Sequence, residues 1–406
     1  MRKFFYRKTT GDIIFSDTLE VAKLNSVAQQ IFEAIQAGHS QDQIASALAS
    51  QYQIDINETQ QDVKDTLSRF QELGVLQTPT EWPLQLHTVI MHIIQNCNSP
   101  CKLCDCWQTK QKTLHTLEQL RPTIHWLKQS MQNQNVMVSG GEPLLHPEIQ
   151  QIAREIKQNQ MHVLLNTNGL LLHRHNWIDS QTVDEVVVSM DGYDAVSYKT
   201  VRGLDGYARV WSNIADLKRK DSKLRVSLRL ILNSVNINQV TEILRQAKLG
   251  GIDRVGVSPL DITNLTFGRK QVNIDQTAQW SQQFLPSETQ MREFHHDLFH
   301  SEDLKEYISE GLCDWSIEDF ERCLDYYRVL RSGRQVNFSN ELCLFPTNSL
   351  VIDYDGGIKP CFYQPAIASL EAPEQYTKQY SSALQKTVAE GRCKSCRGKV
   401  FCDVQI

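Results

Sequence analysis

The sequence lacks long hydrophobic runs and a strong net charge, and each absence excludes a class of protein. No stretch approaches 18 consecutive apolar residues, the length of a membrane-spanning helix. The first residues, MRKFFYRKTTGD, have neither the apolar core nor the small-residue cleavage site of a signal peptide. The formal net charge of −5 provides no basic field for nucleic acid. We therefore expect a cytoplasmic protein that binds neither membranes nor nucleic acid.

The chain also lacks an internal repeat, and its composition changes along its 406 residues. Residues 1–80 combine short strand-like segments with three helical ones, which indicates a small winged-helix-like domain. After a linker with two prolines, residues 88–262 alternate apolar strands with helices. Residues 263–340 are polar and helical, and we expect a bridge there. Residues 341–406 are turn-rich and cysteine-rich, and they form the last expected domain.

The alternating region predicts an α/β fold. Its six strand candidates, among them TVIMHIIQ and DEVVVSM, are nearly continuous in apolar residues, as parallel strands covered on both faces are. Six right-handed βα units are too few for an eightfold barrel, so they predict a partial (βα)6 TIM-like barrel. The helices between the strands are expected at about residues 114–132, 147–159, 171–180, 207–219 and 237–249.

Cysteine is abundant, with eleven residues. In a reducing compartment such cysteines are more often ligands or catalysts than disulfides. Cys313 and Cys323 stand alone in helical-looking sequence, and we expect them to be buried as small hydrophobic residues. The others form two groups, four between residues 97 and 106 and five in the last 64 residues.

The first group follows the first barrel strand directly, in CNSPCKLC. Cys97, Cys101 and Cys104 can hold an iron–sulfur cluster, and three ligands leave one iron open. The C-terminal ends of barrel strands are where such folds carry their active sites. The alternative is a zinc site completed by Cys106, although a Cys-x-Cys pair is poor spacing for zinc.

A second motif, SGGEP at residues 139–143, ends the second strand. Gly140 and Gly141 allow the backbone to approach a ligand closely, and Glu142 can accept hydrogen bonds from a ligand ammonium. The segments NTNG at 166–169, VSMDG at 188–192 and VRG at 201–203 follow along the chain.

Together these motifs resemble those of radical S-adenosylmethionine (SAM) enzymes, over about residues 88 to 260. The resemblance implies a [4Fe–4S] cluster on the three cysteines, with SAM chelating the open iron and yielding a 5′-deoxyadenosyl radical. It also implies SAM contacts from residues at the strand ends, with Asn168 as either a contact or a simple turn, and Ser189 and Asp191 as contacts or strand-end caps. The implied cofactor-binding set is Gly140, Gly141, Glu142, Asn168, Ser189, Asp191, Arg202 and Ser258.

The second cysteine group resembles the SPASM/Twitch extension of these enzymes, which houses auxiliary clusters. The segment LFPTNSLVIDYDGGIKP between Cys343 and Cys361 predicts a hairpin around Gly356. The further cysteines of a full SPASM domain are missing, which favours one auxiliary [4Fe–4S] cluster. We expect its ligands to be Cys343, Cys361, Cys393 and Cys396, with Cys402 as a fifth candidate ligand or a hydrogen donor. The alternative is a structural zinc ribbon.

The N-terminal region resembles the recognition element of ribosomally made, post-translationally modified peptides (RiPPs), the fold of the pyrroloquinoline-quinone peptide chaperone. The resemblance implies that a precursor leader adds as a strand beside Val21 to Leu24, against the face near Lys64, Ser68 and Phe70. The alternatives are a packing domain, a degenerate element and a DNA-binding winged helix. Ten acidic against seven basic residues over 1–80 argue against DNA.

These resemblances predict a radical SAM oxidoreductase that binds a precursor peptide by its leader and oxidatively forms a thioether or carbon–carbon crosslink in its core. A flavodoxin or ferredoxin is the expected reductant. One alternative is a peptide epimerase, in which Cys402 or Cys313 returns a hydrogen atom. Two others are a small-molecule dehydrogenase with a vestigial N-terminal domain and a non-enzymatic iron–sulfur sensor.

Overall fold

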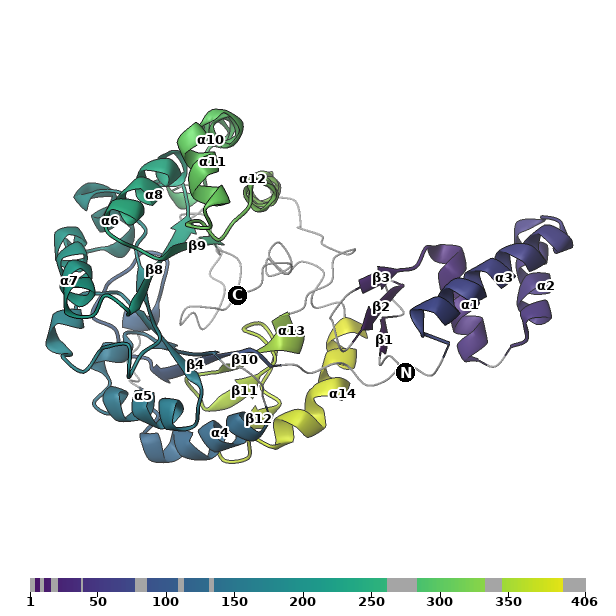
Figure 1. Cartoon of the computed structure of the whole chain (residues 1–406), viewed down its shortest axis with the longest axis horizontal. Coiled ribbons are helices and arrows are strands. Elements are labelled where there is room, and N and C mark those ends of the chain that lie inside the picture. Colours follow the sequence, from purple (N-terminus) through teal and green to yellow (C-terminus); the bar gives the residue numbers. More distant parts are fainter. Residues whose placement is uncertain are drawn as a thin grey trace. The chain divides into compact units, whose positions relative to one another are not determined.

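The computed structural model divides into two compact units, Met1–Leu84 and Gln85–Ile406, each described by itself (Figure 1). The described residues are 4–7, 11–15, 21–37, 39–76, 86–108, 113–130, 135–260, 283–332 and 345–389. Among them, no helix has the length and apolar character needed to cross a membrane.

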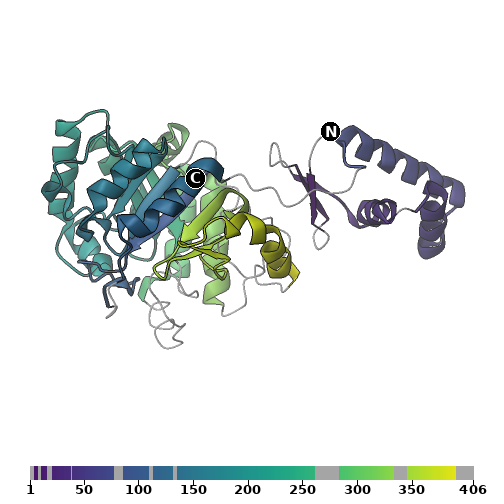
Figure 2. The same cartoon turned by 90° about the horizontal axis from the view of Figure 1, so that it is seen from below.

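The N-terminal unit is a three-stranded antiparallel sheet followed by three helices (Figure 2). Its elements are β1 (Phe4–Arg7), β2 (Asp12–Phe15), β3 (Val21–Lys23), α1 (Ser26–Gln36), α2 (Gln41–Tyr52) and α3 (Ile56–Leu73). Phe32 of α1 joins the layers, because its ring packs edge-on against Phe4 of β1 and Phe70 of α3. This element order is the one that the sequence predicts, and the winged-helix assignment stays a prediction.

The second unit contains a nine-stranded sheet in the order β12-β11-β10-β4-β5-β6-β7-β8-β9. Its strands are β4 (Thr88–Ile94), β5 (Asn135–Gly140), β6 (His162–Thr167), β7 (Glu185–Ser189), β8 (Arg225–Leu232), β9 (Arg254–Pro259), β10 (Ser349–Ile352), β11 (Gly357–Lys359) and β12 (Ala368–Ser369). From β4 to β9 every neighbouring pair is parallel, as predicted. Consecutive parallel strands bring their carboxyl ends to one edge of the sheet, where the loops can share a site.

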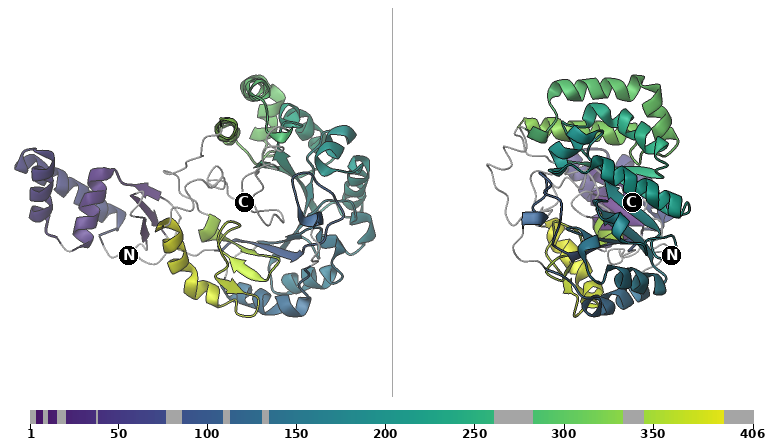
Figure 3. Two further views of the ribbon diagram at one scale, coloured as in Figure 1. Left: turned by 180° about the vertical axis from the view of Figure 1, so that it is seen from behind. Right: turned by 90° about the vertical axis from the view of Figure 1, so that its left-hand side faces the viewer.

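Helices cover the outer face of this curved sheet (Figure 3). The helices of this unit are α4 (Leu117–Ser130), α5 (Ile149–Gln158), α6 (Ala195–Arg202), α7 (Tyr207–Lys220), α8 (Val240–Leu249), α10 (Glu288–His300), α11 (Glu302–Ser309), α12 (Ile317–Arg331), α13 (Phe345–Asn348) and α14 (Gln375–Ala389). Short 3-10 turns add η1 (Cys106–Gln108), η2 (Pro143–Leu145), η3 (Leu172–Arg174) and η4 (Ile237–Gln239).

Two local expectations were wrong. The helix expected at 171–180 is only the η3 turn. The Asp179 side chain accepts backbone hydrogen bonds from Gln181 and Thr182. Such local side-chain bonds compete with the backbone hydrogen bonds of a helix. Helix α6 was not expected, although Asp194 and Ser197 form a reciprocal capping box at its start.

The C-terminal segment extends the same sheet. Strand β10 pairs in parallel with β4, in a register that joins Ile352 to Met91, and it forms the predicted hairpin with β11 around Gly356. Gly356 has a φ of 81°, which favours glycine. The two isolated cysteines, Cys313 and Cys323, are buried as predicted.

Candidate active site at the carboxyl ends of the strands

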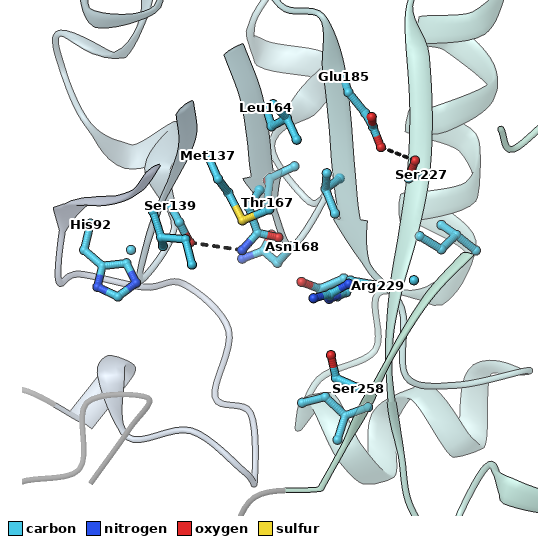
Figure 4. Close-up of a pocket in the computed structure, with 18 of the residues that line it drawn as sticks. His92, Met137, Ser139, Leu164, Thr167, Asn168, Glu185, Ser227, Arg229 and Ser258 are labelled. Carbon is cyan, nitrogen blue, oxygen red and sulfur yellow. Dashed lines mark hydrogen bonds between the residues drawn. The ribbon is translucent and has the colours of Figure 1, made fainter. Parts of the chain in front are cut away.

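A cavity of about 910 Å³ lies inside the curved sheet (Figure 4). All six strands from β4 to β9 contribute to its wall, and Phe345, Tyr354 and Phe362 of the C-terminal segment complete it. Cys97, Cys101 and Cys104 line the cavity from the loop after β4. The structure therefore brings the three-cysteine motif to a space large enough for a small-molecule ligand.

The two glycines after β5 let the chain cross directly over the start of the cysteine loop. Gly141 donates its N–H to the Ile94 carbonyl over 2.7 Å, and Glu142 donates to the Asn96 carbonyl over 2.9 Å. A Cβ atom on Gly141 would lie 2.3 Å from the Asn96 oxygen, closer than atoms can approach. This contact explains why both positions are glycine, and it fixes the backbone just before Cys97.

The end of α6 supports the other side of the loop. Lys102 donates its N–H to the Val201 carbonyl over 2.9 Å. Gly203, which ends α6 with a φ of 77°, lies so close to Pro100 that a Cβ atom would come within 2.2 Å of its oxygen. The loop between Cys97 and Cys104 is therefore held by backbone contacts from two separate motifs, GGEP and VRG.

Arg202 places a positive charge beside the cysteines. Its guanidinium Nη1 lies 3.6 Å from Cys101 Sγ, and its Nε lies 2.8 Å from Asp191 Oδ2. Asp191 also accepts the Ile231 N–H through Oδ1 over 2.7 Å, so both carboxylate oxygens have partners. Burial opposes the charge, but Asp191 and Cys101 hold the pKa of Arg202 above its usual range. The Asp191 side chain thus orients Arg202, and Arg202 is the charge that faces Cys101.

Glu142 is buried and does not line the cavity. Its carboxylate accepts hydrogen bonds from Thr167 Oγ1 (2.7 Å), the Asn168 N–H (2.8 Å) and the Leu144 N–H (3.1 Å). Burial raises its pKa to about 7, although these three donors and Arg202 act in the opposite direction. In this structure Glu142 ties the end of β5 to the end of β6, and the GGEP backbone is the part that faces the cavity.

The polar side chains around the cavity divide into engaged and accessible ones. Asn168 donates to Asn98 Oδ1 over 2.7 Å and accepts the Leu170 N–H over 3.0 Å. It therefore forms a turn, which is one of the two roles expected for it, the other being a contact with SAM. Ser189 and Ser258 line the cavity at the ends of β7 and β9, and both are half-buried. The other predicted contacts that line the cavity are Gly140, Gly141, Asn168, Asp191 and Arg202.

Comparisons with known proteins agree with this arrangement. Residues 91–247 match the radical SAM superfamily, and residues 13–76 match coenzyme PQQ synthesis protein D (PqqD). The chain carries a radical SAM domain and a PqqD-type domain. The first match spans the cysteine loop, the GGEP turn and α6, which are the elements that build the cavity mouth.

Individual relatives are distant. A probable GTP 3′,8-cyclase of Methanococcus aeolicus is 27% identical over 236 residues, which are 56% of this chain and 68% of the cyclase. Among solved structures, Streptococcus suis SuiB bound to the precursor peptide SuiA aligns with a TM-score of 0.53 at 14% identity, over 99% of this chain and 94% of SuiB. The enzyme anSMEcpe with bound AdoMet aligns with a TM-score of 0.53 at 16% identity, over 78% of this chain and 87% of anSMEcpe. At these identities the structures show a shared fold.

The cysteine set fits the cluster that a radical SAM domain implies. Cys97, Cys101 and Cys104 line one cavity and are each only partly buried, and Cys106 lines the same cavity. Burial raises the pKa of Cys97 to about 12, so a thiolate there needs compensating positive charge, which iron supplies. Arg202 adds positive charge beside Cys101. Cys106 is more deeply buried, and its thiol lies 3.3 Å from the Tyr354 hydroxyl. That Cys106 is not a ligand stays a prediction.

The auxiliary-cluster ligands fall mostly outside the described residues. Cys361, directly after β11, is buried, whereas Cys343, Cys393, Cys396 and Cys402 lie outside the described ranges. The auxiliary cluster and its ligand set therefore stay predictions.

Several cavity residues were missed from the sequence. Asn166 donates to Ser139 Oγ over 3.0 Å, and Arg229 enters the cavity from the middle of β8 (Figure 4). His92 enters from β4, where Asp353 approaches it from the end of β10. Strand alternation could have identified His92 and Arg229, because each is polar within an apolar strand. Nothing local could have identified Asp353, because its partner lies at the other end of the domain.

Proposed function

We propose that this protein is a radical SAM maturase that binds a ribosomal precursor peptide by its leader and oxidatively crosslinks a residue of its core. One observation carries the proposal: a single chain joins a PqqD-type domain with an open edge strand to a radical SAM domain with a large cavity. The SuiB structure, which contains a bound precursor peptide, supports a peptide substrate for an enzyme of this fold.

The cluster would be held by Cys97, Cys101 and Cys104. When bound, the cluster and SAM supply a 5′-deoxyadenosyl radical that removes a hydrogen atom from the substrate. The backbone of Gly140 and Gly141 offers hydrogen-bonding groups at the cavity mouth, and Ser189 and Ser258 offer hydroxyls deeper in. Arg202 lies where a carboxylate next to Cys101 would meet a positive charge. These residues bind and orient SAM, and the cavity wall keeps water from the reacting atoms.

The leader would bind at β3. Among the described residues this strand pairs only with β2, so its other edge is available for a further strand. Val21 is 42% exposed, so its side chain is accessible for contact with a bound peptide. Lys64 and Ser68 of α3 are also exposed. Main-chain bonds from β3 would supply affinity, and these side chains would supply specificity.

An oxidative crosslink is favoured over epimerisation. The resemblance of the C-terminal cysteines to a Twitch extension implies an acceptor for the electron left on the product, with a flavodoxin or ferredoxin as the reductant of the first cluster. Epimerisation instead needs a thiol that returns hydrogen. Cys313 is one of the two thiols predicted for that role. Its backbone pairs with Val255 of β9 in an isolated β-bridge, and Cys313 does not line the cavity.

Co-expression with each short open reading frame beside the gene tests the activity. A peptide that loses two hydrogens, by mass spectrometry, only with the wild-type enzyme and not with Cys97→Ala supports an oxidative crosslink. An unchanged mass with solvent deuterium at an α-carbon would show epimerisation instead. Iron content adds a second measurement, because two cubane clusters predict roughly eight irons per chain and one predicts roughly four.

A proline scan tests the leader site. Neighbouring N–H groups of a strand point in opposite directions, so Val21→Pro, Ala22→Pro and Lys23→Pro separate the open edge from the β2 ladder. A variant that keeps its melting temperature but loses leader binding, by fluorescence anisotropy of a labelled leader, identifies an outward N–H. Equal leader affinity in all folded variants would contradict binding at β3.

A further inference from the structure

A histidine and a carboxylate meet on the cavity wall where the first barrel strand joins the C-terminal segment. Alternation along β4 directs Thr88, Ile90 and His92 into the cavity, and all three line it. Figure 4 shows the His92 imidazole facing the open space, opposite Arg229 of β8. The His92 side chain is 13% exposed, so it is largely buried but accessible to a ligand in the cavity.

Asp353 approaches His92 from the end of β10, which pairs with β4. Its Oδ1 lies 3.5 Å from His92 Nδ1 and accepts the Tyr354 N–H over 2.8 Å, while Oδ2 forms an ion pair with Lys359. Burial alone would raise the pKa of Asp353, but the neighbouring His92 ring and Lys359 hold it below its usual range. Asp353 is therefore a permanent carboxylate on the Nδ1 side of the ring.

Two aromatic rings fix the plane of the imidazole. Tyr354 stacks on His92 with 4.7 Å between centroids and 14° between planes, and Phe362 contacts it at 5.9 Å. The Tyr354 hydroxyl is itself 3.3 Å from Cys106 Sγ, which ties this group to the cysteine loop. His92 Nε2 has no hydrogen-bond partner among the described residues, so it is the ring atom left for a substrate.

The other titratable groups near this pair are accounted for. Lys359 is committed to Asp353, and His115 donates through Nε2 to the Asp353 carbonyl over 3.1 Å. On the β5 side, the residue in register with His92 is Ser139, which is uncharged. Among the described residues, His92 and His162 are the two histidines that line the cavity, and His92 is the one with a carboxylate, Asp353, beside its ring.

We propose that His92, oriented by Asp353, is the catalytic base that takes a proton from the core residue as the crosslink forms. The proposal rests on the proposed function. One hydrogen atom leaves a substrate carbon to become part of 5′-deoxyadenosine. The second reacting group, a thiol or an aromatic carbon, bonds to that carbon and gives its proton to His92 Nε2. The remaining electron passes to an iron–sulfur acceptor, so the product is two hydrogens lighter.

His92→Gln tests the assignment with the precursor peptide found by co-expression. A positioned base contributes about 10²-fold or more, so we expect product formation to fall by about that factor. Cleavage of SAM to 5′-deoxyadenosine should continue, because His92 does not touch the cysteine loop. The ratio of product to 5′-deoxyadenosine is therefore the decisive readout. His162→Gln is the matched control, since His162 also lines the cavity but lies at the first residue of β6, away from the carboxyl ends of the strands.

Two further measurements separate a base from a structural residue. The pH profile of the product ratio should differ between the wild-type enzyme and His92→Gln, because only the wild-type enzyme has an imidazole that can act as the base. In His92→Gly, added imidazole should restore product formation, whereas added toluene, which fills space without a base, should not. Product formation by His92→Gln within threefold of wild type, or rescue by toluene, would overturn the assignment. Absence of product from the wild-type enzyme would instead overturn the proposed function.

Discussion

Two carboxylates each hold a basic side chain on different walls of the same cavity, and they differ in what that side chain can do. Asp191 holds Arg202 beside Cys101 in a pair whose side chains are 3% and 12% exposed. Asp353 holds His92 on the wall formed by β4 and β10, and Lys359 shares the carboxylate. Arginine stays charged at every physiological pH, so the first pair can only position charge. Histidine exchanges protons, so only the second pair can take part in proton transfer.

The largest expected effect is the loss of SAM cleavage when a cysteine of the three-cysteine loop is replaced. Cys97→Ala should abolish 5′-deoxyadenosine formation, because two thiols cannot replace the three that face the cavity. The measurement is anaerobic incubation of reconstituted protein with SAM and dithionite. Retained SAM cleavage would contradict the assignment of the cluster to this loop.

The two carboxylate pairs should differ in stability. Asp191→Asn leaves a buried guanidinium without its counter-charge, which costs about 3 to 5 kcal/mol. Asp353→Asn should cost less, about 1 to 3 kcal/mol, because the Asp353 side chain is itself 26% exposed and Lys359 can reach water. Urea unfolding of the apoprotein at pH 7 measures both. An equal loss of unfolding free energy in both variants, or a larger loss for Asp353→Asn, would contradict the expected difference in stability between the two pairs.

Glu142 extends the comparison to a carboxylate without a dedicated cation. Burial raises its pKa from 4.5 to about 7, so the folded state binds the proton more tightly than the unfolded chain does. Its contribution to the free energy of unfolding is complete below pH 4.5 and decreases by about 3 kcal/mol as pH rises to 7. Glu142→Gln, which is uncharged throughout, should show a shallower loss of stability over this range. A slope identical to that of the wild-type apoprotein would contradict the raised pKa.

The smallest expected effect concerns Cys106. This thiol contacts Tyr354 beneath His92 and falls outside the three-cysteine spacing, so Cys106→Ala should keep the cluster absorbance and SAM cleavage of the wild-type protein. It is the matched control for Cys97→Ala, because both remove one thiol from the same loop. A loss of iron comparable with that of Cys97→Ala would make Cys106 a ligand.

Much of the fold was readable from local pattern. Apolar strands separated by capped helices predict the parallel order from β4 to β9, since each signal acts over a few residues. The capping box at Ser40 and the glycine after α3 mark helix ends in the same way. The failures were also local: side-chain hydrogen bonds replaced the helix expected at 171–180, and the short helix α6 was overlooked.

In the candidate site, too, some residues could be identified from local sequence, whereas the contacts of others became clear only from the structure. Motif spacing identifies Cys97, Cys101, Cys104 and the two glycines, because their partners lie one or two βα units away. The resemblance assigned Glu142 to a ligand contact and Asp191 to a ligand contact or a strand-end cap, and in the structure both carboxylates bond to the protein. A motif shows that a residue type is needed at a position, but not whether a ligand or a neighbouring strand needs it.

By itself, the sequence determined the order of the strands from β4 to β9, their parallel pairing and the three-cysteine loop, because these depend on periodicity and short spacings. Only the tertiary structure decided that β10 pairs with β4 and places Asp353, Tyr354 and Phe362 around His92. That pairing is set by backbone hydrogen bonds and burial between segments at opposite ends of the unit. Contacts of this kind leave no periodic signal in the chain, and here they assemble the wall that faces the substrate.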